Sequence, residues 1–214
     1  MKFYFNLRSP YSWLTVHDLL ARHPGLARRL EWIPFWDPEE ATLRELDAAG
    51  GRFGYTAMSK AKHLYILQDV RRLARARGLE PRWPLDRGPR WEVPHLAYLI
   101  AADHGAGQEF AVRAGELRWQ QGADICDPQV VAELGRSLGL DEAGLIAAAD
   151  DPKLRERGID ALRSADRDGV FGVPFLVHGR EKFWGLDRLD SFAESAGEPV
   201  AGGYPPEDHP GGCG

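Results

Sequence analysis

The residues with the clearest chemical potential lie near the N-terminus, in the segment Ser9-Pro10-Tyr11-Ser12. Serine is a preferred N-cap residue and proline is favoured at the first helical position, so we expect a helix to begin here. The first N–H groups of a helix carry a partial positive charge, and a serine hydroxyl can donate a hydrogen bond. The segment therefore predicts either an ordinary helix cap or a site where Ser9 holds an anion.

A second segment of interest is Gly172-Val173-Pro174-Phe175, late in the chain. A proline at the entrance to a strand cannot donate a hydrogen bond to the sheet, which indicates an edge strand, a bulge or a cis turn. Taken alone, this pattern is more typical of a proline that simply marks the start of a strand than of a binding site.

Short apolar runs at both ends of the chain predict the elements that position these segments. Residues 2–6 and 30–35 read as strands with a helix between them, which gives a βαβ start. Residues 174–178 and 181–184 read as two strands, followed by a helix over 186–196. Ser9 therefore follows the carboxyl end of a strand, where open α/β sheets bind their ligands.

Between these ends the chain is helical in pattern from about Glu39 to Asp166, interrupted by a Pro-rich loop over residues 80–91. The helices are predicted over residues 59–77, 92–104, 107–120, 127–138, 141–149 and 151–166. The fold class is therefore α/β, with the βαβ…ββα outline of a thioredoxin-like domain split by a large all-helical insertion. The expected boundaries are 1–38 and 167–196 for the thioredoxin-like domain, 39–166 for the insertion and 197–214 for a flexible tail.

Four stretches in the same order carry a resemblance to a known family. The sequence resembles the DsbA-like group that contains 2-hydroxychromene-2-carboxylate isomerases and kappa-class glutathione transferases. The stretches are residues 3–12, the pattern Lys62-x-x-Tyr65-x-x-x-Asp69-x-x-Arg72, residues 169–174 and residues 183–189. The sequence departs from the family at Asn6, where an acidic residue is usual, and at Phe53, where kappa-class transferases carry an asparagine.

The resemblance implies a site for glutathione or another low-molecular-weight thiol. In the family the serine that corresponds to Ser9 donates a hydrogen bond to the thiol sulfur. By the same resemblance Val173, before a cis Pro174, pairs its backbone with the cofactor, Asp187 holds the γ-glutamyl ammonium and Lys62 the glycyl carboxylate. Asp187 can equally be a charge in a first helical turn, and Lys62 part of a solvated helix face.

Aromatic side chains supply candidates for a substrate pocket between the two parts of the chain. Those singled out are Tyr11, Tyr65, Trp91 and His95. For each of them, packing in the core is an equally good interpretation.

These observations predict an isomerase that uses a bound thiol to interconvert the cis and trans forms of an unsaturated carbonyl or aromatic small molecule. A kappa-like glutathione transferase is the alternative, followed by a thiol-binding protein without turnover. A disulfide oxidoreductase is disfavoured because both cysteine positions of a Cys-Pro-x-Cys redox motif are serines here, Ser9 and Ser12. The two cysteines, Cys126 and Cys213, are far apart and neither is expected to be catalytic.

Composition narrows the possible partners. Lys and Arg total 27 against 32 Asp and Glu, for a net charge of −5, so no global positive field favours nucleic acid or an anionic membrane. The histidines show no metal-binding spacing, no run is apolar enough to span a bilayer, and no signal peptide is apparent. We therefore expect a cytoplasmic enzyme without a metal, and a homodimer is one option for its assembly.

Overall fold

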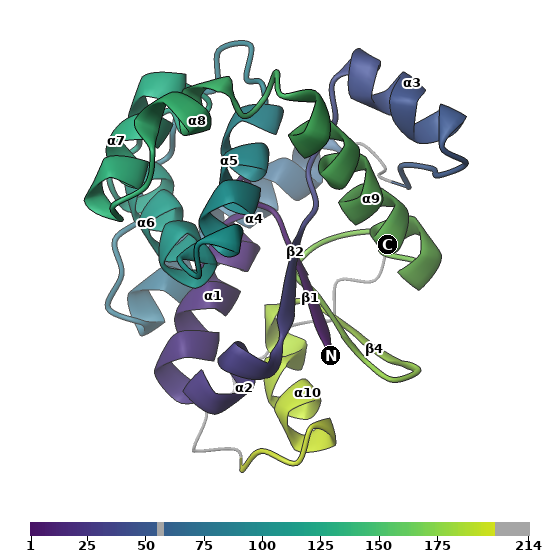
Figure 1. Cartoon of the computed structure of the whole chain (residues 1–214). Helices are drawn as coiled ribbons and strands as arrows, with labels where there is room; N and C mark the ends of the chain where they lie inside the picture. Colours follow the sequence, from purple (N-terminus) through teal and green to yellow (C-terminus); the bar gives the residue numbers. More distant parts are fainter. Residues whose placement is uncertain (55–57, 200–214) are drawn as a thin grey trace.

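A four-stranded sheet with the strand order β2-β1-β3-β4 forms the centre of the molecule (Figure 1). The computed structural model describes residues 1–54 and 58–199. β1 pairs in parallel with β2 and antiparallel with β3, and β3 pairs antiparallel with β4. The strands are β1 (Lys2–Phe5), β2 (Glu31–Pro34), β3 (Phe175–His178) and β4 (Glu181–Trp184).

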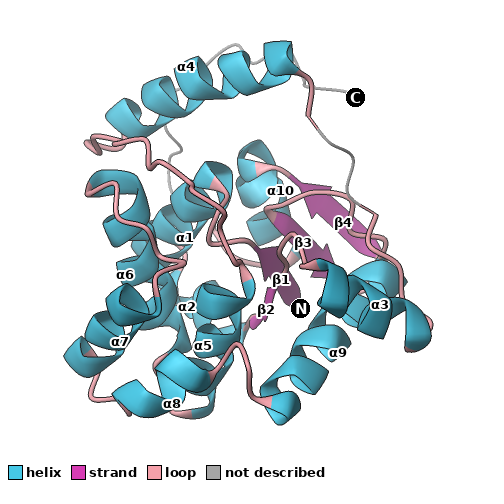
Figure 2. Cartoon of the chain, turned by 90° about the horizontal axis from the view of Figure 1, so that it is seen from above, coloured by secondary structure: helices cyan, strands magenta, loops and turns pink. Residues whose placement is uncertain are grey.

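The predicted βαβ and ββα ends are confirmed. α1 (Pro10–Arg22) connects β1 to β2, and β4 runs into the short 3₁₀ helix η1 (Leu186–Arg188) and then α10 (Leu189–Ser195). Seen from above, α9 (Pro152–Asp168) and α10 lie on opposite sides of the sheet (Figure 2). The predicted tail over residues 197–214 lies almost entirely outside the described residues.

The helices predicted for the middle of the chain all form, within two residues of the expected ends. They are α4 (Lys60–Ala76), α5 (Glu92–Asp103), α6 (Gly107–Gln120), α7 (Pro128–Ser137), α8 (Glu142–Ala147) and α9. The sequence pattern does not predict α2 (Pro24–Arg29), and α3 (Glu40–Ala48) falls within the helical pattern from Glu39 without a predicted range of its own. α2 has Pro24 at its first helical position, which is compatible with a helix start.

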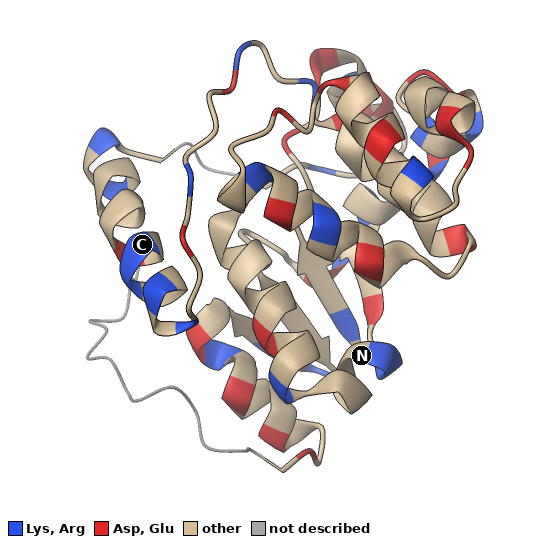
Figure 3. Ribbon diagram, turned by 90° about the vertical axis from the view of Figure 1, so that its left-hand side faces the viewer, with Lys and Arg blue, Asp and Glu red and all other residues tan. Residues whose placement is uncertain are grey.

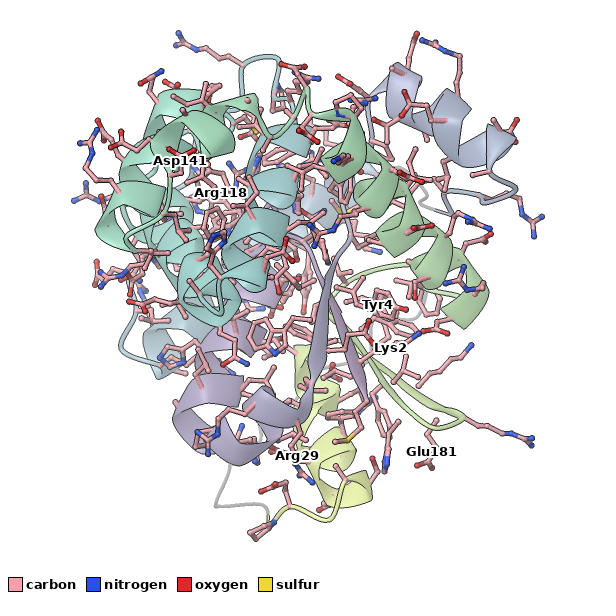
Figure 4. All side chains as sticks on the ribbon, in the orientation of Figure 1. Lys2, Tyr4, Arg29, Arg118, Asp141 and Glu181 are labelled. Carbon is pink, nitrogen blue, oxygen red and sulfur yellow. The ribbon has the colours of Figure 1, made fainter. Side chains whose placement is uncertain are left out.

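β1 is buried on both faces because helices cover both sides of the sheet. Phe3 and Tyr4 have no exposed surface. The Tyr4 hydroxyl donates to Asp168 Oδ2 at 2.5 Å, and Lys2 Nζ lies 2.9 Å from the same oxygen. Figure 4 shows Lys2 and Tyr4 on the side of β1 that faces α9. These two donors hold the pKa of Asp168 below its usual value, although burial alone would raise it.

The surface carries charges of both signs side by side on most elements (Figure 3). No helix in the described part of the chain is long and apolar enough to cross a membrane.

Candidate functional site

The two turns singled out by the sequence lie at the same end of the sheet. Phe175, at the start of β3, is paired with Tyr4, near the end of β1. The turn that enters β3 through Val173 and Pro174 therefore lies next to the turn that leaves β1 and carries Ser9. The peptide bond between Val173 and Pro174 is cis.

The end of β4 reaches the same place. Trp184, the last residue of β4, pairs with Phe175, and the Gly185 N–H donates to the Pro174 carbonyl at 3.0 Å. Gly185 has φ +106°, and a Cβ at that position would lie 2.5 Å from Asp187 Oδ1, so the turn favours glycine. Asp187 follows in η1, and its carboxylate is 48% exposed and 3.4 Å from Arg188 Nη1.

Ser9 is the N-cap of α1, with Pro10 at the first helical position as predicted. Ser9 Oγ accepts a hydrogen bond from the Ser12 N–H at 3.2 Å. Because this bond uses a lone pair of the oxygen, the hydroxyl hydrogen remains able to donate to a ligand. The first turn of α1 contains no acidic residue that would oppose an anion there. The cap and the anion site are therefore compatible roles of one hydroxyl.

The second serine of the motif is part of the turn itself. Ser12 is 1% exposed, and its Oγ accepts from the Asn6 N–H at 3.2 Å. Asn6 Oδ1 in turn accepts from the Arg8 N–H at 2.8 Å. Asn6 therefore shapes the loop before Ser9 with its own backbone and amide groups.

α4 is joined to α1 through the buried carboxylate of Asp69. Asp69 Oδ2 accepts from the Tyr11 hydroxyl at 2.7 Å, and Oδ1 accepts from Tyr65 Oη at 3.3 Å and Arg72 Nη2 at 3.0 Å. Burial and the bond to Asp69 raise the pKa of Tyr11, so its phenol stays protonated. Lys62 precedes Asp69 by seven residues, which is about 10 Å along the same face of the helix. Its own side chain is exposed.

The family model of the DSBA-like thioredoxin domain matches residues 1–196. The chain belongs to this family. Among curated proteins it is similar to 2-hydroxychromene-2-carboxylate isomerase of Sphingobium xenophagum, with 28% identity over 90% of this chain and 95% of the relative. The protein of the same name from Pseudomonas putida is 25% identical over 87% of this chain and 89% of the relative.

Solved structures share the fold at lower identity. A 2-hydroxychromene-2-carboxylate isomerase matches with a TM-score of 0.71 and 22% identity, covering 92% of this chain and 93% of that one. The cytosolic disulfide reductase DsbM from Pseudomonas aeruginosa with GSH matches with a TM-score of 0.58 and 18% identity, covering 91% and 97%.

Within this DSBA-like domain, two of the four pocket candidates lie in the core. Trp91 is 4% exposed and His95 is 0% exposed, so neither offers a surface to a substrate. Their burial agrees with the core interpretation that the sequence left open and lends no support to a place in a substrate pocket. Tyr65, at 45% exposed, and Tyr11, which is partly exposed, remain accessible.

His95 has a contact that the sequence did not indicate. Its Nε2 accepts from the Leu7 N–H at 3.0 Å, although the two residues are 88 positions apart. Nothing in the sequence around a single histidine in an apolar helix indicates a hydrogen bond to so distant a residue.

Two open hollows of about 480 and 450 Å³ lie between α3 and α9 and between α1 and α6. Neither is lined by any of the candidate site residues, and both are bordered by charged side chains. The candidate site is therefore the end of the sheet at which the turns carrying Ser9, Pro174 and Asp187 lie.

Proposed function

We propose that this chain is a thiol-dependent cis–trans isomerase of a small unsaturated carbonyl compound, similar in reaction to the 2-hydroxychromene-2-carboxylate isomerases that it resembles. The supporting observation is the Ser9 hydroxyl, which caps α1 and keeps a hydrogen to donate at the positive end of the helix. The residue types argue against the redox chemistry of disulfide reductases, because Ser9 and Ser12 cannot form a disulfide.

The proposed cofactor is glutathione or another low-molecular-weight thiol. Glutathione carries a thiol, an ammonium group and two carboxylates. Ser9 and the N-terminus of α1 fit the thiolate, Lys62 fits a carboxylate, and Asp187 fits the ammonium group. The backbone of Val173 beside Pro174 fits the cysteinyl part, by resemblance to the family. The DsbM structure with GSH supports the proposal, because it carries a thiol on the same fold.

A bound thiol would supply a nucleophile that adds reversibly to a conjugated double bond, so that the bond can rotate. The role of Ser9 is to donate a hydrogen bond to sulfur, and a bond to a charged acceptor is worth about 1.5–3 kcal/mol. This corresponds to a fall of about 1–2 units in the thiol pKa. A fall from about 8.5 to about 7 raises the thiolate fraction at pH 7 from about 3% to about half.

The proposal is tested by titrating the thiolate of bound glutathione through its ultraviolet absorbance, in the wild type and in Ser9→Ala. We expect the bound thiol pKa to rise by about 1–2 units in the variant and isomerase turnover at pH 7 to fall by about 5–50-fold. Equal pKa values in the two folded proteins would reduce Ser9 to a helix cap. Accumulation of a thiol conjugate instead of an isomer would indicate a transferase.

Asp141→Ala is the matched control. Asp141 caps α8 by accepting from the Gly144 N–H at 2.8 Å and lies among the helices of the insertion (Figure 4). Its loss should lower stability by the roughly 0.5–2 kcal/mol typical of a helix cap, as Ser9→Ala also should, but leave the thiol pKa unchanged.

A further inference from the structure

We infer that His95 is a positioning residue, which holds the turn carrying Ser9 in place from the helical part of the chain. The inference deepens the proposed function and rests on it for its activity measurements. The contact between His95 and the turn is a structural property that can be tested separately.

Most hydrogen bonds of the turn come from its own residues. The Ser9 N–H donates to the Asn6 carbonyl at 2.9 Å, and Asn6 Oδ1 accepts from the Arg8 N–H. The Leu7 N–H, two residues before Ser9, instead donates to His95 on α5. This bond therefore ties the turn to a separate part of the fold.

The direction of this bond fixes the proton on the imidazole. Because the Leu7 N–H is the donor, His95 Nε2 must be unprotonated. The proton of the neutral ring is then on Nδ1, which donates to the Trp91 carbonyl at 2.7 Å. Burial lowers the pKa of His95 to about 3, so the ring is neutral at physiological pH. Both nitrogens thus have one partner each, in one tautomer.

The surroundings of the ring prevent it from turning. His95 stacks on Trp36 with ring centroids 5.4 Å apart and an angle of 17°, and it meets Trp91 edge-on at 6.4 Å. The Trp91 ring is also contacted by the guanidinium groups of Arg8, at 5.5 Å, and Arg118, at 4.9 Å. Since Arg8 immediately precedes Ser9, the packing around His95 reaches the turn by a second route.

This arrangement fits the requirement of the chemistry at Ser9. A hydroxyl that stabilises a thiolate must sit at a fixed distance from sulfur, and a misplacement of about 1 Å can lower turnover by about 100-fold. An acceptor that is buried and rotationally locked supplies that fixed position without contacting the substrate.

Two substitutions separate the two nitrogens of His95. His95→Gln places an amide near the position of Nε2, so its oxygen can accept from the Leu7 N–H. His95→Asn reaches only the position of Nδ1, so it can serve the Trp91 carbonyl but not Leu7. We expect His95→Asn to lower kcat by about 10–100-fold and to raise the bound thiol pKa, whereas His95→Gln keeps kcat within about 3-fold of the wild type. Equal losses in both variants, or no loss in either, would overturn the inference.

Amide hydrogen exchange at Leu7 tests the contact without a thiol. At matched global stability, exchange at Leu7 should be at least about 10-fold faster in His95→Asn than in the wild type and unchanged in His95→Gln. Equal exchange in all three proteins would overturn the inference, whatever the thiol result. Faster exchange at Leu7 in His95→Asn, together with a bound thiol pKa that is the same in Ser9→Ala and the wild type, would have a different meaning. It would refute the proposed function but leave the role of His95 in the turn.

A measurement on the wild type keeps the inference testable even when a variant does not fold. The nitrogen-15 chemical shifts of His95 should show a neutral ring with its proton on Nδ1 at pH 6. A ring protonated on Nε2 could not accept from Leu7, and this result would overturn the inference.

Discussion

The turn that carries Ser9 and the helix that carries Lys62 are held in different ways. The turn is tied by buried groups, among them Ser12 and His95. The buried residues of α4 are Asp69, Val70 and Ala74, all in its second half, and its first half is largely exposed, with Tyr65 at 45%. Figure 2 shows α4 along the upper edge of that view, outside the helices that surround the sheet.

The second half of α4 has two polar attachments to α1. One is Asp69 with the Tyr11 hydroxyl, and the other is the ion pair of Arg77 with Asp18, whose side chains are 6% and 1% exposed. The Ser9 turn and α4 therefore have different roles in the proposed site. The sulfur end requires a fixed donor and lies on the rigid turn, whereas the outer groups of a flexible peptide thiol tolerate a less constrained helix.

Removing Asp69 should break the attachment of α4 nearest the site. Asp69→Ala leaves the Tyr11 hydroxyl without its acceptor and Arg72 without its ion pair, although Arg72 is half exposed and contributes little. We expect the free energy of unfolding to fall by about 2–4 kcal/mol. The KM for the thiol should rise several-fold because Lys62 is carried on the same helix, while the thiol pKa at Ser9 stays unchanged.

Tyr65→Phe is the control within the same cluster. It removes only the 3.3 Å bond to Asp69 and keeps the ring under the Arg72 guanidinium. Chemical denaturation should show a loss below about 1 kcal/mol. A thiol pKa that shifts in Asp69→Ala as much as in Ser9→Ala would show that the turn and α4 are not held separately.

The sequence predicted the turns that carry Ser9 and Pro174 better than the distant residues that hold them in place. Ser9, Pro10 and Pro174 are local signals, because a helix cap and a proline before a strand depend on neighbouring residues. Strand order and register then bring them together, which a βαβ…ββα pattern already implies. The bond from His95 to Leu7 could not be predicted, since it depends on tertiary packing between distant segments.

The same limit explains why the sequence left two interpretations open for Trp91 and His95. Both are grouped with Tyr65 as pocket candidates because all three carry aromatic side chains. Their burial is decided by how α5 packs against β1, where Tyr98 meets Phe5 at 4.9 Å. Aromatic residues serve cores and pockets alike, so residue type alone cannot separate the two.

The pH dependence of stability should sharpen the contrast, because it reports on the buried side of the turn. The pKa of His95 is lowered to about 3 in the folded chain, against about 6.5 when unfolded. The unfolded chain therefore binds a proton below pH 6.5 that the folded chain does not bind. Stability from this group is fully present above pH 6.5 and is lost as the pH falls toward 3, by about 1.4 kcal/mol per unit at most.

Denaturant unfolding at pH 7 and pH 5 measures this loss. The wild type should lose about 2 kcal/mol more than His95→Gln over that interval, because glutamine does not titrate. Comparing the two proteins cancels the contribution of the carboxylates common to both. The same pH dependence in both proteins would mean that His95 is not held neutral.

The smallest effect is expected from replacing the two cysteines. This replacement tests whether a thiol of the protein itself, rather than a bound thiol, takes part in the reaction. Cys126 is buried, and burial raises its pKa to about 12, so almost none of it is thiolate at pH 7. Cys213 lies outside the described residues. Replacing both by alanine should lower stability by about 1 kcal/mol through lost packing at Cys126 and keep thiol-dependent turnover within about 2-fold. A complete loss of turnover in a folded double variant would move the nucleophile from a bound thiol to the protein, and the contrast between the Ser9 turn and α4 would then lose its chemical meaning.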